Sequence, residues 1–221
     1  MMKPFSLLIA LFALLFSACE TTSSTADSVT DAVTETAADA ANTAQNAISE
    51  VTDAAAEMMK GENYEIKVID DKIKSPRKEL TGEIAGVPVT INYGSPAVND
   101  RVIYGDLVPY EKVWRTGANE ATRITFGKDV KVGTEGEMLK AGTYSLFTLP
   151  VSKEEWTIIF NKVADQWGAY DYEDSSDAAR VSGSSAASNK AERMDFVLAG
   201  NEVRFMWDDL MVSFPVDAAS K

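Results

Sequence analysis

The chain has 221 residues and a net charge of −13, from 34 acidic and 21 basic residues. A field of this sign repels phosphate backbones, so we expect no nucleic-acid partner. The absence of histidine excludes Ser-His-Asp triads and histidine-ligated zinc, and the single cysteine excludes an intramolecular disulfide. We expect no cofactor and no bound metal.

Residues 1–18 are predicted to be a lipoprotein signal peptide. Lys3 precedes the apolar run PFSLLIALFALLF at residues 4–16, which is too short to span a bilayer comfortably. Small residues stand directly before Cys19, which is where such signals are cut and where the lipid is attached. The alternative is an ordinary secreted protein. We therefore expect a cell-envelope protein that faces the periplasm and is anchored in the membrane through lipid on Cys19.

Residues 19–62 are predicted to form a low-complexity tether. The segment is rich in Ala, Thr, Ser, Asp and Glu, and contains no proline or aromatic residue. Its larger apolar residues recur every three or four positions, which is typical of a weak amphipathic helix. A face made mostly of alanine buries little area, so the segment reads as a spacer. A self-associating coiled coil is the alternative.

The pattern changes to period two at about Asn63, and residues 63–217 are predicted to form an antiparallel β-sandwich, followed by a tail at 218–221. Alternating segments predict hairpins about Ala85-Gly86 and Gly200-Asn201, and further strands within ATRITF, AGTYSLFTLP, EWTIIFN and LMVSFPV. Several short strands at this spacing are typical of a sandwich or a barrel. The Ser- and Ala-rich residues 174–190 are predicted to be a mobile surface loop with a short strand near Arg180-Val181.

About half of the chain resembles the family called domain of unknown function 2911. The similar run begins at SPR (75–77) and continues through VTINYGSPAV, LVPYEKVWRTGANEATRITF, KAGTYSLFTLP, EWTIIFNK and QWGAYDY to DAARV (177–181). Similar members are secreted or lipid-anchored envelope proteins, mostly from Bacteroidota. The resemblance implies an envelope location and no particular activity.

Polar and aromatic residues concentrate in three pieces of the chain, around 114–120, 161–162 and 166–170, that we interpret as a ligand site. Indole and phenol rings beside amide, carboxylate and guanidinium groups suit a glycan fragment or another envelope component. Tyr93, Arg101 and Tyr110 could extend the set. The predicted ligand-binding residues are Trp114, Arg115, Asn119, Glu120, Lys162, Gln166, Trp167 and Tyr170.

Two other functions compete with ligand binding. Glu120 could be the general acid or base of a hydrolase or lyase, with Arg115 or Lys162 tuning its pKa. A glycosidase would need a second carboxylate, for which Asp106, Glu111 and Asp171 are candidates. In a purely structural or assembly module, the WRTGANE stretch would instead hold the fold together, with Arg115 and Glu120 as an ion pair across its loop. The sequence assigns no oligomeric state.

Overall fold

The computed structural model describes residues 63–219. The predicted signal peptide, Cys19 and the tether therefore lie outside the described residues. Within them, the one helical element is a 3-10 turn at Asp174–Ser176. No helix in this part of the chain has the length and apolar character needed to cross a membrane.

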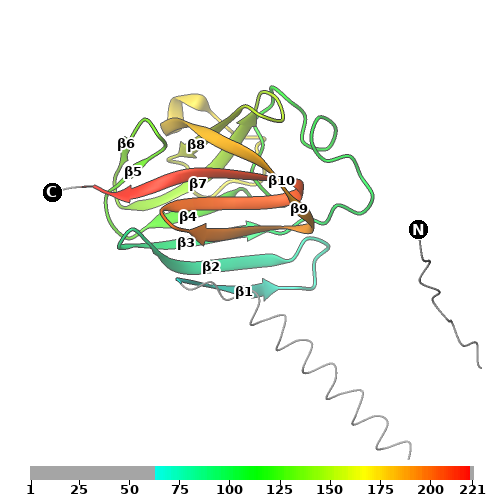
Figure 1. Ribbon diagram of the computed structural model, residues 1–221, viewed down its shortest axis with the longest axis horizontal. Coiled ribbons are helices and arrows are strands. Elements are labelled where there is room, and N and C mark those ends of the chain that lie inside the picture. The colour runs from blue at the N-terminus through cyan, green and yellow to red at the C-terminus, as the bar shows by residue number, and fades with distance from the viewer. Residues whose placement is uncertain (1–62, 220–221) are drawn as a thin grey trace, which may run out of the picture. The chain divides into compact units, whose positions relative to one another are not determined.

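The domain is an all-β structure, as predicted, built from ten antiparallel strands in the order β1-β2-β3-β4-β7-β8-β9-β10-β5-β6 (Figure 1). The strands are β1 (Tyr64–Asp70), β2 (Arg77–Ile84), β3 (Val87–Gly94), β4 (Thr122–Phe126), β5 (Val130–Val132), β6 (Glu137–Leu139), β7 (Gly142–Pro150), β8 (Trp156–Asn161), β9 (Asp177–Ala199) and β10 (Glu202–Ala218).

The sheet folds over into two facing layers because β9 is long enough to belong to both. Its first residues pair with β8, and its later residues pair with β10. Figure 1 shows β9 and β10 lying across the face of β3, β4 and β7. This arrangement is the predicted antiparallel β-sandwich, and it leaves an apolar space between the layers.

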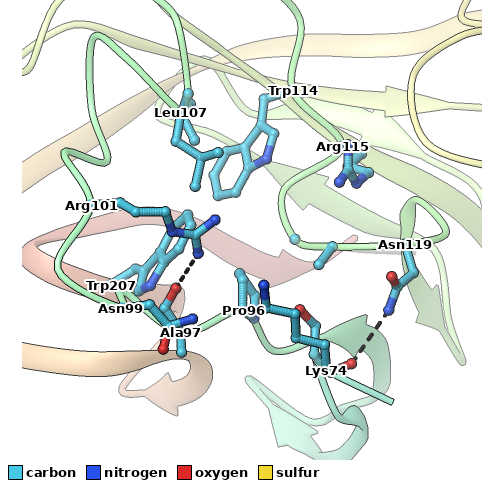
Figure 2. Close-up of a pocket in the computed structure, with 14 residues that line it drawn as sticks. Lys74, Pro96, Ala97, Asn99, Arg101, Leu107, Trp114, Arg115, Asn119 and Trp207 are labelled. Atoms are coloured by element: carbon cyan, nitrogen blue, oxygen red, sulfur yellow. Dashed lines mark hydrogen bonds between the residues drawn. The ribbon is translucent and has the colours of Figure 1, made fainter.

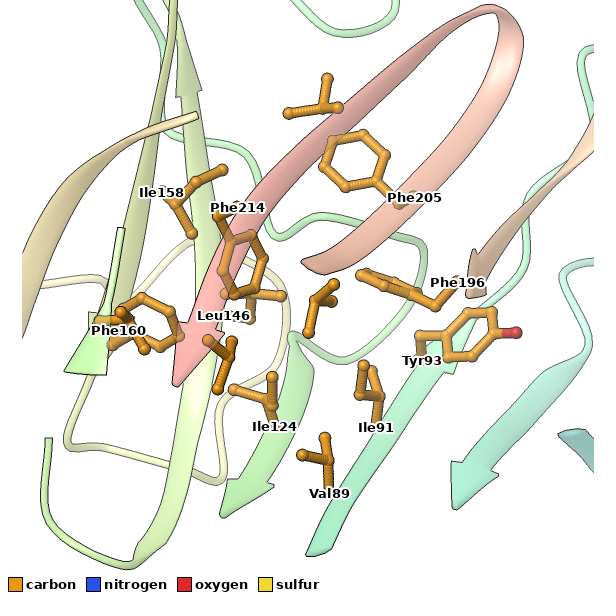
Figure 3. Packing of buried hydrophobic residues seen from close by; sticks show 14 of the residues in the cluster. Val89, Ile91, Tyr93, Ile124, Leu146, Ile158, Phe160, Phe196, Phe205 and Phe214 are labelled. Carbon is orange, nitrogen blue, oxygen red and sulfur yellow. The ribbon is translucent and has the colours of Figure 1, made fainter. Parts of the chain in front are cut away.

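Aromatic side chains from both layers fill that space (Figure 3). The rings of Phe160 on β8 and Phe214 on β10 meet edge to face with centroids 5.6 Å apart, and those of Tyr93 and Phe196 do so at 4.9 Å. The alternation of apolar residues along each strand puts one face inward, as the period-two pattern predicted. The core therefore holds the layers at a fixed separation.

Both predicted hairpins are confirmed. Ala85 and Gly86 each have a positive φ, of 48° and 75°, as a two-residue type I′ turn requires. At the second hairpin Ala199 pairs with Glu202, and Gly200 has a φ of 62°. Glycine adopts this conformation without the clash that a Cβ would cause.

The predicted mobile loop at residues 174–190 is wrong. Apart from the 3-10 turn at its start, this segment belongs to strand β9, whose residues Asp177–Gly183 pair with β8 and whose residues from Ser184 onward pair with β10. Small polar side chains are poor signals of a strand, but here backbone hydrogen bonds to two neighbours fix its conformation. The final strand also runs unbroken from Glu202 to Ala218, where the sequence predicted two pieces.

Candidate functional site

The WRTGANE stretch (residues 114–120) forms a closed loop beside β7. Trp114 exchanges backbone hydrogen bonds with Thr148 (2.7 and 2.9 Å), whereas Thr122 pairs with Leu146. Residues 115–121 therefore bulge out between two neighbouring positions of β7. The Thr122 amide closes the loop by donating to the Arg115 carbonyl at 3.1 Å. Both ends of the loop are thus fixed by the sheet.

Two loop residues adopt a left-handed backbone conformation, which is unfavourable for one of them. Thr116 has a φ of 50° and Asn119 a φ of 64°. Asparagine tolerates this region, whereas it is rare for a β-branched residue such as threonine, for which it costs roughly 1–3 kcal/mol. Thr116 is fully buried, and its hydroxyl lies 3.2 Å from that of Thr148. The surrounding structure therefore holds the loop in a fixed, strained shape.

A cavity of about 270 Å³ opens beside this loop (Figure 2). Indole rings form part of its wall: Trp114 and Trp207 stack with centroids 5.9 Å apart and planes 18° from parallel. The lining residues are Lys74, Ser75, Pro96, Ala97, Asn99, Arg101, Leu107, Val108, Trp114, Arg115, Gly117, Ala118, Asn119 and Trp207. The cavity thus collects residues from four separate parts of the chain.

Cationic groups dominate the charge of this cavity. Lys74, Arg101 and Arg115 line it, and no carboxylate does so among the residues of the described domain. Arg101 is held in place, since its guanidinium donates to the backbone carbonyls of Ala97 and Val98 at 2.5 and 3.0 Å. Figure 2 shows this contact below the ring of Trp114. The cavity wall is therefore positive in a chain whose net charge is −13.

Two buried hydrogen-bond donors at the cavity have no partner within residues 63–219. They are Nε of Arg115 and Nε1 of Trp207. Burial lowers the pKa of Arg115, and the nearby Tyr170 phenol opposes this shift. Buried polar groups in folded proteins are almost always hydrogen-bonded, so each exception calls for an explanation such as a ligand or a water molecule.

The remaining residues of the loop serve the fold. Glu120 forms an ion pair with Arg77 on β2, not with Arg115. The predicted Arg115–Glu120 pair is therefore wrong, because the loop packs against β2 and β3, where the Gly94 carbonyl accepts from the Ala118 amide at 3.2 Å. The Asn119 side chain likewise donates to the Ser75 carbonyl at 3.3 Å.

The predicted stretch 161–170, which holds the other two pieces, lies next to the loop but outside the cavity. Gln166 is buried, and its side-chain amide donates to Asn161 and to the Val163 carbonyl. The backbone carbonyl of Gln166 accepts from the Ala121 amide at 3.0 Å. Lys162 is exposed. Trp167 and Tyr170 are 60% and 82% exposed. This stretch supports the loop from behind and presents two rings to solvent.

Gly168 brings this stretch close to the cavity. A Cβ at this position would lie 3.9 Å from Cδ of Arg115 and 3.2 Å from the ring of Tyr170. Its positive φ of 70° suits glycine. Arg115 is therefore bordered by the cavity on one side and by the 166–170 turn on the other.

The sequence analysis did not identify Trp207 as a candidate site residue. In the structure Trp207 is 1% exposed and belongs to β10. No cluster of acidic or cysteine side chains suited to a metal ion occurs among residues 63–219. The alternation of Phe205, Trp207 and the residues around them could have indicated an inward-facing ring.

The family model described as Protein of unknown function (DUF2911) matches residues 75–216 of the chain. This span includes every residue that lines the cavity except Lys74. No curated protein and no solved structure matches the chain. The description of the family names no activity, so a function has to be argued from the geometry of the site.

Proposed function

The chain belongs to the DUF2911 family, and from the geometry of the cavity we propose that its β domain is a binding module for a glycan fragment or another component of the cell envelope. The observation that carries this proposal is the cavity itself, with two indole rings and two unpartnered buried donors in its wall. Preformed pockets that combine apolar walls with a few placed polar groups are the usual form of a small-ligand site.

The size and chemistry of the cavity fit a sugar ring. Its volume of about 270 Å³ is just below the 300–1,000 Å³ of pockets for drug-sized ligands, so it suits one small ring. Indole faces stack on the apolar side of sugar rings, and the Arg and Asn side chains can bond to hydroxyls. The exposed rings of Trp167 and Tyr170 would contact further units outside the cavity.

Binding is favoured over acid–base catalysis by the position of the carboxylates. Glu120, the candidate acid or base, is paired with Arg77 and does not line the cavity. A glycosidase needs two carboxylates on either side of the bond that is cleaved. A hydrolase or lyase that uses Glu120 remains the second candidate, for which the ion pair would have to open.

The proposed location of this module is the cell envelope. We propose that Cys19 carries a lipid and that residues 19–62 tether the β domain to the membrane on the periplasmic side. The test is mass spectrometry of the full chain from membranes, compared with Cys19→Ser. A mature chain that begins at Cys19 and carries acyl groups would support the proposal, and an unmodified Cys19 would refute it.

Ligand binding can be tested by blocking the cavity. Leu107 lines it and is 43% exposed, so Leu107→Trp can narrow the entrance without disturbing the core. Val102→Trp is the matched control, because Val102 is 65% exposed in the same segment but does not line this cavity. The full chain would be titrated by calorimetry with mono- and disaccharides, neutral and acidic.

We expect at least one saccharide to bind the parent and Val102→Trp with equal affinity and to bind Leu107→Trp at least tenfold more weakly. Equal binding by all three proteins would place the ligand elsewhere. An absence of binding to every saccharide would refute the glycan proposal. A Glu120→Gln variant that binds normally would further favour a binding module, whereas turnover lost in that variant would favour the enzyme.

A further inference from the structure

We infer that the ligand of this cavity carries a carboxylate, as in a uronic acid unit of a glycan, and that Arg115 binds it. This inference rests on the proposed function and specifies the ligand more narrowly. Its starting point is the contrast between the chain, with a net charge of −13, and the cavity, whose charged lining residues are all cationic. A negatively charged protein would repel an acidic ligand unless it provided a local positive site.

Arg115 is the cation that is free to take this role. Arg101 already donates to two backbone carbonyls. The Arg115 side chain forms no hydrogen bond and no ion pair with any residue in the described range, and its Nε is buried. A guanidinium matches a carboxylate in shape and can donate two parallel hydrogen bonds to it. An anion in the cavity would therefore give the Arg115 guanidinium the counterion that the described domain does not supply.

Three neighbouring groups extend the same recognition. Trp207 lines the cavity, and its buried Nε1 has no partner among the described residues. Lys74 is exposed at the rim and forms no ion pair with the described residues. Figure 2 shows Arg115 and Asn119 on the same side of the cavity, with the ring of Trp114 between Arg115 and Leu107. A sugar ring against the indole would thus bring a carboxylate substituent within reach of Arg115.

Other partly buried cationic side chains of the domain already have carboxylate partners and so do not offer an anion site. Arg77 is occupied by Glu120, Lys78 by Asp195 at 2.6 Å, and Arg180 by Asp177 at 2.7 Å. These groups balance charges within the fold, and none of them lines the cavity. Arg115 differs because its charge is half-buried and has no counterion in the domain.

The test compares ligands that differ only in the acidic group. Glucuronate and glucose share a ring and differ at C6, as do galacturonate and galactose. The full chain would be titrated with each pair, and with glucose 6-phosphate, by calorimetry at neutral pH. We expect the uronates to bind at least tenfold more tightly than the neutral sugars, because a charge-assisted pair with Arg115 is added.

Variants then assign the effect to Arg115. Arg115→Gln should lower uronate affinity about tenfold to a hundredfold and should change hexose affinity little. Arg115→Lys should restore part of the loss. Arg204→Gln is the matched control, since Arg204 lies on β10 outside the cavity and pairs locally with Glu202. Within residues 63–219 the Arg115 side chain makes no hydrogen bond, so these variants should unfold at or slightly above the parent's temperature.

The outcomes separate the inference from the proposed function. Equal binding of uronates and neutral sugars would overturn the inference while the glycan module stands. Tighter binding of glucose 6-phosphate than of glucuronate would overturn the inference that the ligand carries a carboxylate. Uronate binding that Arg115→Gln leaves unchanged would overturn the role of Arg115. Failure of every saccharide to bind would refute the proposed function and, with it, the inference.

Discussion

Glu120→Gln should destabilise the domain whereas Arg115→Met should not, although both residues lie in the WRTGANE loop. Glu120 is the counterion of Arg77, whose side chain is 12% exposed, and is itself 39% exposed. Breaking a fully buried pair costs roughly 3–5 kcal/mol, and an exposed pair contributes about 0.2–1 kcal/mol. Because this pair lies between those limits, we expect Glu120→Gln to lose about 2 kcal/mol.

Arg115→Met should leave the free energy of unfolding unchanged or raise it by about 1 kcal/mol. Nε of Arg115 is buried without a partner in the described domain, and a buried donor without a partner costs roughly 1–3 kcal/mol. Methionine keeps an unbranched apolar side chain against the cavity wall and removes this donor. Strain elsewhere in the loop is the same in both variants.

The measurement is urea unfolding of the full chain, followed by tryptophan fluorescence. Trp114, Trp156 and Trp207 are at most 8% exposed and report on the core. Lys162→Met is the control for removing a cation at an exposed position and should shift stability by no more than about 0.5 kcal/mol. A loss in Arg115→Met as large as that in Glu120→Gln would show that Arg115 holds the fold, and would refute the reasoning.

Three further predictions concern the core, the close backbone contact between Gly94 and Ala118, and the pH dependence of stability. Phe160→Ala should lower the free energy of unfolding by roughly 3–5 kcal/mol, because Phe160 is fully buried against Phe126 and Phe214. Phe160→Leu should lower it less, and an equal loss of stability in both variants would contradict this packing. Gly94→Ala should lose about 1–3 kcal/mol and weaken ligand binding, because its Cβ would lie 2.2 Å from the Ala118 carbonyl oxygen at the cavity wall; a neutral effect in both assays would contradict it. Burial and the hydrogen bond to Asp177 raise the pKa of Tyr172 to about 12, so the contribution of Tyr172 to stability should be constant below pH ~10 and be lost as pH rises toward 12; the fall in stability over this range should be less steep in Tyr172→Phe.

The strand pattern of this domain was predictable because its signals are local. The type I′ turn at Ala85-Gly86 and the turn at Gly200-Asn201 each join two alternating segments, and both formed as expected. Strand β9 escaped prediction for the opposite reason. Its residues 182–189 are mostly Ser, Ala and Gly, which carry little alternation, and their conformation comes from pairing with distant strands.

The cavity was only half predictable. Trp114, Arg115 and Asn119 were singled out because polar and aromatic residues cluster in one short stretch. Lys74 and Trp207 were not, since nothing in the chain order indicates that they meet: Lys74 precedes β2, and Trp207 lies in β10. The pairing of Glu120 with Arg77 was also out of reach, because it depends on the loop packing against β2.

The residues of the WRTGANE loop divide between two roles: some support the fold, and one lines the proposed site. Glu120, Asn119 and Thr116 make hydrogen bonds or ion pairs inside the domain, while Arg115 lines the cavity with a buried Nε that has no partner among the described residues. A sequence free to optimise stability would replace Arg115 with an apolar residue and relax the positive φ of Thr116. The supporting contacts on both sides of Arg115 instead hold a costly conformation in place. Such an arrangement is expected where the unpaired group binds something outside the chain.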